Sequence, residues 1–95
     1  MSAVERIYVV YIFEGEDKLR RPISLFTGGN GDDYIDNSKK ILREHFNMKS
    51  VTLTELEEDK RETDKWIDRT FHLTGEVVES NKAIDEVVMI RATKN

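Results

Sequence analysis

The fold is decided by residues 7–13, which read Ile7-Tyr8-Val9-Val10-Tyr11-Ile12-Phe13. β-Branched and aromatic side chains in a short run are typical of a β-strand. Alternate side chains of a strand point to opposite faces of its sheet, and here both faces are apolar. Such a strand is expected to be central in the sheet and covered on both sides, by its own chain or by a partner. The run is far shorter than the roughly 20 apolar residues of a membrane helix.

A second strand and a helix are predicted directly after this run. Residues 15–17 form a turn, and residues 20–27 read as a strand with Pro22 near its start, where a missing N–H is tolerated. The sequence Gly-Gly-Asn-Gly at 28–31 breaks the chain, and Asp32 or Asp33 then offers an N-cap for a helix that ends near Phe46. Its apolar stripe at helical spacing consists of Tyr34, Ile35, Ser38, Ile41, Leu42, His45 and Phe46.

The second half of the chain predicts further strands. Apolar and polar residues alternate from Ser50 to Thr54, again from Lys65 to Val77 with room for a bulge at Gly75, and finally over residues 85–93. Residues 56–66 are compatible with a short helix opened by a capping box or with an irregular loop. The order ββαβββ predicts a two-layer α+β fold, in which one amphipathic helix packs on one face of a mostly antiparallel sheet. We expect residues 1–95 to form a single domain.

The net charge is concentrated in one segment. The chain has 19 acidic residues against 15 Lys and Arg, which gives a net charge of −4. Residues 55–68 contain seven acidic and three basic residues, so they account for the whole excess. Segments of this kind are either solvated connections or surfaces that dock on a basic partner.

Composition excludes several classes of function. Cysteine is absent, which excludes disulfides, thiolate catalysis and cysteine-ligated zinc. An acidic balance argues against direct binding of nucleic acid. No membrane segment is predicted, and the charged pair before residue 7 does not fit a secretory signal. We therefore expect a cytoplasmic protein.

No catalytic, cofactor or metal motif is recognised. The glycine-rich residues 28–31 are followed by Asp32 and Asp33 instead of the Lys-Ser/Thr of a phosphate loop, and these acids are interpreted as helix caps. His45 and His72 stand outside any hydrolase or metalloprotease pattern. We expect no enzyme activity, no cofactor and no metal site.

A short basic cluster lies close in sequence to the aromatic strand. It consists of Lys18, Arg20 and Arg21, near Tyr8 and Tyr11. Aromatic and basic side chains share a sheet in RNA-recognition domains, but the RNP sequence of those domains is absent. Charges that prevent edge-to-edge strand pairing explain the cluster equally well.

The run Glu55-Leu56-Glu57-Glu58-Asp59-Lys60-Arg61-Glu62-Thr63-Asp64, in a small cysteine-free chain without an active-site motif, resembles small phage proteins that inhibit host defence or redirect host machinery. The resemblance implies a non-enzymatic inhibitor or adaptor in the host cytoplasm, bound to a host protein through a basic, nucleic-acid-binding surface. Trp66 is interpreted either as an apolar anchor of that interface or as a cover for the end of the core. The expected partner-binding residues are Glu55, Glu57, Glu58, Asp59, Glu62, Asp64 and Trp66.

Two other classes of function remain open. A strand that is apolar on both faces, such as residues 7–13, is also expected in an assembly subunit that forms a homodimer or larger homo-oligomer through that strand. A small enzyme or ligand-binding protein would instead use a pocket around His72 or Tyr11.

Overall fold

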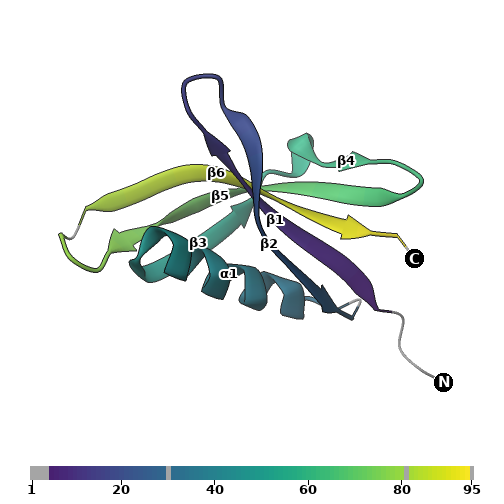
Figure 1. The fold of residues 1–95 in the computed structure, drawn as a ribbon, viewed down its shortest axis with the longest axis horizontal. Coiled ribbons are helices and arrows are strands. Elements are labelled where there is room, and N and C mark those ends of the chain that lie inside the picture. Colours follow the sequence, from purple (N-terminus) through teal and green to yellow (C-terminus); the bar gives the residue numbers. More distant parts are fainter. Residues whose placement is uncertain (1–4, 30, 81, 95) are drawn as a thin grey trace.

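The computed structural model describes residues 5–29, 31–80 and 82–94 and contains one helix packed on one face of an antiparallel sheet (Figure 1). The strand order is β2-β1-β6-β5-β3, and the short strand β4 pairs with β5 beyond the end of β3. The predicted two-layer α+β fold is therefore confirmed. The elements are β1 (Arg6–Glu14), β2 (Leu19–Gly28), α1 (Asp33–Phe46), β3 (Met48–Glu55), the 3₁₀ helix η1 (Glu57–Asp59), β4 (Arg61–Glu62), β5 (Trp66–Val77) and β6 (Ala83–Thr93).

Strand β1 lies between β2 and β6, which confirms the prediction of a central strand. Tyr8, Val10 and Ile12 point into the core and are no more than 4% exposed. Val9 and Tyr11, on the other face, are only half-buried. One face of the apolar strand is thus sealed, and the other keeps contact with solvent.

Helix α1 seals the first face. Tyr34, Ser38 and Leu42 recur every four residues and are its buried positions, while His45, expected on the same stripe, is exposed. The helix ends because Asn47 adopts a left-handed conformation and donates its backbone N–H to the carbonyl of Glu44. No helix of the described residues is long and apolar enough to cross a membrane.

The bulge expected at Gly75 lies on the neighbouring strand instead. Pairing of β5 with β6 is continuous across Gly75, whereas the register of β3 shifts between Met48 and Ser50. A Cβ atom added at Gly75 would stand 1.9 Å from the carbonyl oxygen of Ser50. Gly75 is needed because the backbone of the irregular strand approaches it closely.

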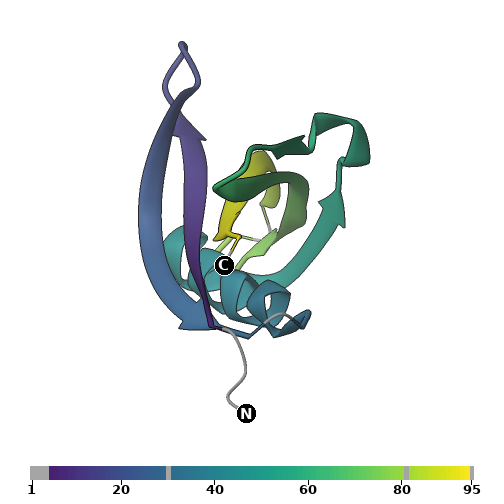
Figure 2. The same cartoon turned by 90° about the vertical axis from the view of Figure 1, so that its right-hand side faces the viewer.

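The segment that the sequence left open between helix and loop contains a single 3₁₀ turn, η1, followed by β4. Leu56 occupies the N-cap position of η1, which has no side-chain cap hydrogen bond, so the proposed capping box is not formed. Seen from the side, the β1–β2 hairpin and the β3-η1-β4 segment rise on opposite flanks above α1 (Figure 2). This places the acidic residues at one flank of the sheet.

Candidate functional site

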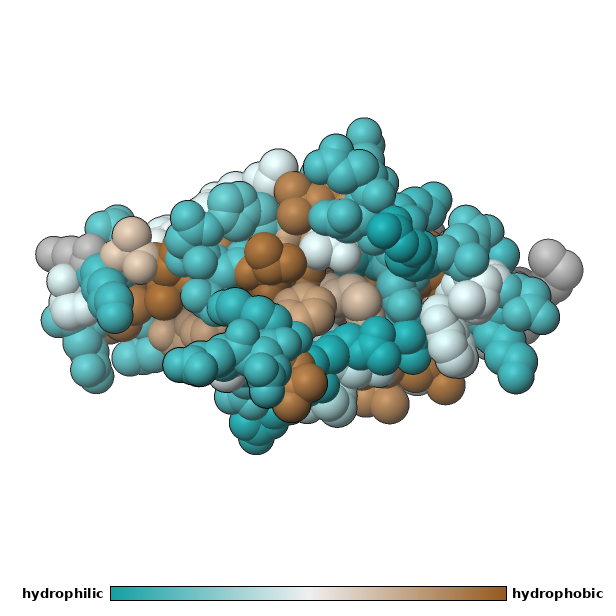
Figure 3. Space-filling model, turned by 90° about the horizontal axis from the view of Figure 1, so that it is seen from above, coloured by the Kyte–Doolittle hydropathy of each residue, from teal (hydrophilic) through white to brown (hydrophobic). Residues whose placement is uncertain are grey.

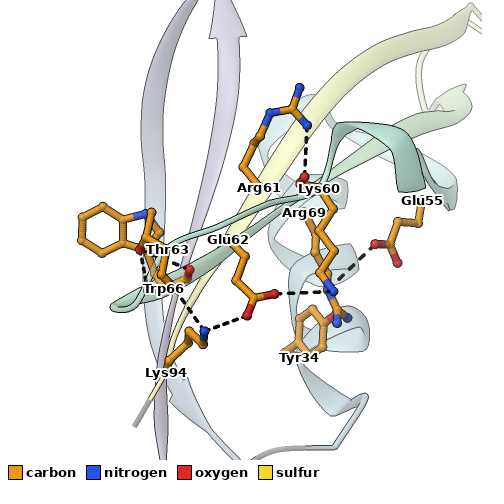
Figure 4. Close-up of polar contacts among 9 residues, drawn as sticks. All are labelled: Tyr34, Glu55, Lys60, Arg61, Glu62, Thr63, Trp66, Arg69 and Lys94. Atoms are coloured by element: carbon orange, nitrogen blue, oxygen red, sulfur yellow. Dashed lines mark hydrogen bonds and ion pairs between the residues drawn. The ribbon is translucent and has the colours of Figure 1, made fainter.

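The acidic segment separates into paired and unpaired carboxylates. Glu62 Oε2 lies 2.7 Å from Lys94 Nζ, and Glu55 Oε2 lies 3.9 Å from Arg69 Nε (Figure 4). Asp68 is bound by Arg91 through two hydrogen bonds of 2.7 and 2.9 Å. Three of the seven carboxylates are thus neutralised within the chain.

The other four carboxylates face solvent. Glu57, Glu58 and Asp59 follow one another on η1, and Asp64 lies in the β4–β5 turn. All four are exposed, and within the described ranges none of them forms an ion pair. We call Glu57, Glu58 and Asp59 the acidic turn.

The acidic turn is held in place by backbone hydrogen bonds. Leu56 donates its N–H to the carbonyl of Thr70 at 2.8 Å, which ties the start of η1 to β5. Arg61 Nη1 donates to the carbonyls of Glu58 and Lys60 at 3.1 and 3.0 Å. The adjacent arginine therefore braces the backbone of the turn, and its guanidinium forms no ion pair with the carboxylates of the turn.

The β4–β5 turn is closed by Thr63. Its hydroxyl accepts hydrogen bonds from the backbone N–H groups of Lys65 and Trp66, both at 3.1 Å. Lys94 Nζ donates to the backbone carbonyl of Thr63 at 3.0 Å and to the carboxylate of Glu62 at 2.7 Å. The hydrogen bond and charge of Lys94 lower the pKa of Glu62.

Trp66 packs on an arginine on the sheet face opposite α1. The guanidinium of Arg91 lies 4.0 Å from the centre of the indole ring and 5.7 Å from the centre of Tyr11. Arg20 covers Tyr11 at 4.9 Å. We call Arg20, Tyr11, Arg91 and Trp66, which come from four neighbouring strands, the arginine–aromatic ladder.

Trp66 is the one predicted partner-binding residue that belongs to the ladder. Trp66 stacks on Arg91 on the face opposite α1, whereas Glu55 pairs with Arg69, whose guanidinium donates to Tyr34 of α1 (Figure 4). Tyr11, Arg20 and Trp66 were all recognised in the sequence, but Arg91 was missed as the residue that joins them. Its only sequence signal is its alternation with Ile90 and Ala92, which places it on the face away from the core.

The face opposite α1 also carries apolar surface (Figure 3). Leu25 is 66% exposed and Val87 is 43% exposed. Leu25 is on β2 and Val87 is on β6, the two strands that flank β1. This surface would be the contact in an assembly through β1.

The two histidines occupy separate surroundings. The Nε2 atom of His72 contacts Asp85 on β6, and His45 packs edge-on against Phe46. In the part of the chain that the structure describes, no group of three His, Cys, Asp or Glu side chains could hold a metal ion. No family model, curated protein or solved structure matches this chain.

Proposed function

We propose that this protein is a non-enzymatic protein-binding inhibitor or adaptor. Its acidic turn would dock on a basic, nucleic-acid-binding surface of another protein. The observation that carries this proposal is the set of three consecutive exposed carboxylates on a backbone that hydrogen bonds hold in place. A preorganised charged surface loses little conformational entropy on binding, and complementary charge accelerates association.

The carboxylates of the segment would contribute unequally to this interface. Glu57, Glu58, Asp59 and Asp64 are exposed without an ion pair among the described residues and would face the partner. Glu55 and Glu62 already have basic partners, so we assign them to the rim. Trp66 would add apolar contact only where the partner also reaches the ladder.

The resemblance to phage proteins that redirect host machinery suggests which class of protein is bound. The binding partner would be a host protein in the host cytoplasm, blocked or redirected by occupation of its nucleic-acid groove. Carboxylates presented in a row would compete there with phosphates for the same arginines and lysines.

The experiment is a capture comparison among three immobilised proteins. In the first variant, Glu57→Gln, Glu58→Gln and Asp59→Asn remove the charge of the acidic turn. In the matched control, Glu16→Gln, Asp17→Asn and Glu44→Gln remove three exposed carboxylates elsewhere. We expect wild type and control to retain the same host protein from lysate at about 0.05 M salt and to release it at about 0.5 M. The acidic-turn variant should not retain it.

Equal retention of that protein by all three would overturn the proposal. Once the partner is identified, the purified pair allows a sharper measurement. The association rate should fall with salt for wild type and control, and should be slow at all salt concentrations for the acidic-turn variant.

A second candidate is an assembly subunit that forms a homodimer through the β1 face. The exposed Leu25 and Val87 beside the half-buried side of β1 favour it. Light scattering after size exclusion tests it with Leu25→Glu and Val87→Glu. A dimer that these changes convert to a monomer would support the assembly subunit, and a monomeric wild type would reject it.

A further inference from the structure

We propose that the cavity between the first turn of α1 and the sheet binds a small organic monocarboxylate. The cavity measures about 130 Å³ and lies on the α1 side of the sheet. It is independent of the acidic turn, so the proposal goes beyond the docking function above. An engineered apolar cavity of about 150 Å³ is large enough to hold benzene, and this one is open to solvent on one side, so it is adequate for a small aromatic ring whose carboxylate lies at the mouth.

The floor of the cavity is apolar and rigid. Ile67, Ile90 and Ala92 line it together with the ring of Tyr8. Tyr8 is 2% exposed and is stacked between Phe26 and Tyr34, with ring centres 5.3 and 4.9 Å away. Its hydroxyl donates to the carbonyl of Gly29 at 2.5 Å. A preformed apolar floor of this kind is characteristic of small-molecule sites.

Two guanidinium groups supply the anion-binding wall. Arg69 lies on β5 and Arg6 on β1, and both line the cavity. Arg6 Nη1 donates to the carbonyl of Thr93 at 2.7 Å, which fixes its position beside the cavity. Two positive charges beside an apolar floor select a ligand with a negative head and an apolar body.

Arg69 retains unused hydrogen-bonding capacity. Its Nη1 donates to the hydroxyl of Tyr34 at 2.9 Å, while Glu55 stands 3.9 Å from Nε, too far for a hydrogen bond. Of the five N–H donors of a guanidinium, only this one has an acceptor among the described residues. A carboxylate accepts two parallel hydrogen bonds from such a group, so it is the ligand that would satisfy Arg69.

The neighbouring charges favour a monoanion. Glu55 is paired with Arg69, and Glu62 lies opposite Ile67, which lines the cavity. These carboxylates offset part of the positive charge of Arg6 and Arg69, so the attraction that remains does not repay the larger cost of desolvating a doubly charged phosphate. The apolar floor also contributes to binding only if the ligand has an apolar part.

The test is a titration of the ¹⁵N-labelled protein followed by two-dimensional NMR, with benzoate as the probe. Neutral benzamide tests the need for the carboxylate, and inorganic phosphate tests the need for an apolar body. We expect saturable shifts of the backbone amides near Arg69 and Ala92 with benzoate, and at least tenfold weaker binding of benzamide and phosphate. Arg69→Gln should weaken benzoate binding about tenfold or more, because the paired charge-assisted hydrogen bonds are lost.

Two further variants separate binding from folding. Arg43→Gln removes an exposed arginine on α1 and should leave the benzoate affinity unchanged. Ala92→Leu fills the floor without changing charge and should abolish saturable binding, which decides the matter if Arg69→Gln fails to fold. The spectrum itself reports whether each variant is folded. Absence of saturable shifts in wild type, equal affinity for benzamide or phosphate, or unchanged affinity in folded Arg69→Gln or Ala92→Leu would overturn the proposal.

Discussion

The two faces of the sheet start from the same sequence pattern and are completed in different ways. On the α1 face, Leu73, Val88 and Ile90 are no more than 2% exposed and pack with the apolar stripe of the helix. On the opposite face no α-helix of the described residues covers the sheet, and arginine side chains lie over the aromatic rings of Tyr11 and Trp66 (Figure 1). Long basic side chains bury their aliphatic stems on such rings while their charged ends remain near water.

The face covered by α1, which we call the closed face, and the opposite, open face also differ in how their polar groups are satisfied. Asp68 is 8% exposed on the ladder face, where Arg91 satisfies both of its carboxylate oxygens. Ser38, on the side of α1 that faces the sheet, is completely buried, and its hydroxyl has no hydrogen-bond partner among the described residues. The difference teaches that the open face accepts a nearly buried carboxylate because an arginine satisfies it, whereas the core under the helix leaves even a neutral hydroxyl without a partner among the described residues.

The largest effect is expected from the closed face. Leu73→Ala should lower the free energy of unfolding by about 2–5 kcal/mol, because the residue is completely buried and its truncation leaves a cavity. Leu25→Ala, at a position 66% exposed, is the matched control and should change it by less than about 0.5 kcal/mol. Denaturant unfolding measures both. Similar values for the two variants would mean that the two faces do not differ in packing.

The next effect tests the open face. Asp68→Asn should cost about 2 kcal/mol, since it removes the charge that Arg91 binds from a pair whose side chains are only 12% and 18% exposed. Glu14→Gln removes the charge from the pair of Glu14 and Arg21, whose side chains are 47% and 62% exposed, and should cost much less because solvent already screens this pair. If Asp68→Asn is as mild as this control, the ladder does not depend on its carboxylate, and stacking alone holds the open face.

Much of this arrangement could be predicted from alternation and helical spacing. The central position of β1 and the strand character of residues 66–77 could be predicted because they depend only on the period of apolar residues, which burial selects directly. The conformation of residues 56–66 could not be predicted in this way, because few apolar side chains anchor them. Their turn depends on hydrogen bonds such as that from the Arg61 side chain to the backbone carbonyl of Glu58, which no residue pattern encodes.

The candidate sites were less accessible to sequence than the fold. The division of the acidic residues depends on which strand lies beside each one: Lys94, which pairs with Glu62, is distant in sequence and reaches it only through the end of β6. The cavity at Arg69 likewise needs three strands and a helix to meet. Charge counting located the acidic segment, but the register of the sheet determines which charges are neutralised.

A smaller effect of opposite sign, a gain in stability, is expected at the buried side of α1. Ser38→Ala should raise the free energy of unfolding by about 1 kcal/mol, because it removes a buried hydroxyl without a partner and improves helix propensity. Asn37→Ala, at the exposed neighbouring position, should gain only the propensity difference of about 0.5 kcal/mol. Destabilisation by Ser38→Ala would show that the closed face does satisfy this hydroxyl and would weaken the contrast between the faces.

The smallest effect concerns Glu62 at the rim of the α1 face. Its pKa is lowered in the folded protein by the hydrogen bond and charge of Lys94, so folding favours the deprotonated form. Its contribution to stability is therefore complete above the unfolded pKa and is lost as the pH falls through the lower folded pKa. The difference in unfolding free energy between wild type and Glu62→Gln should be small and constant near neutral pH, and should decline through the acidic range. Urea unfolding at a series of pH values measures it.

Lys94→Met provides the decisive background for this measurement. Without the lysine, Glu62→Gln should no longer change the pH dependence of stability, because the hydrogen bond to Glu62 and the neighbouring positive charge that acts on it most strongly are both gone. Raised salt should weaken the effect in wild type, since the pair lies at the surface. A pH dependence that persists in the Lys94→Met background would assign the lowered pKa to Lys60 or Arg69 instead.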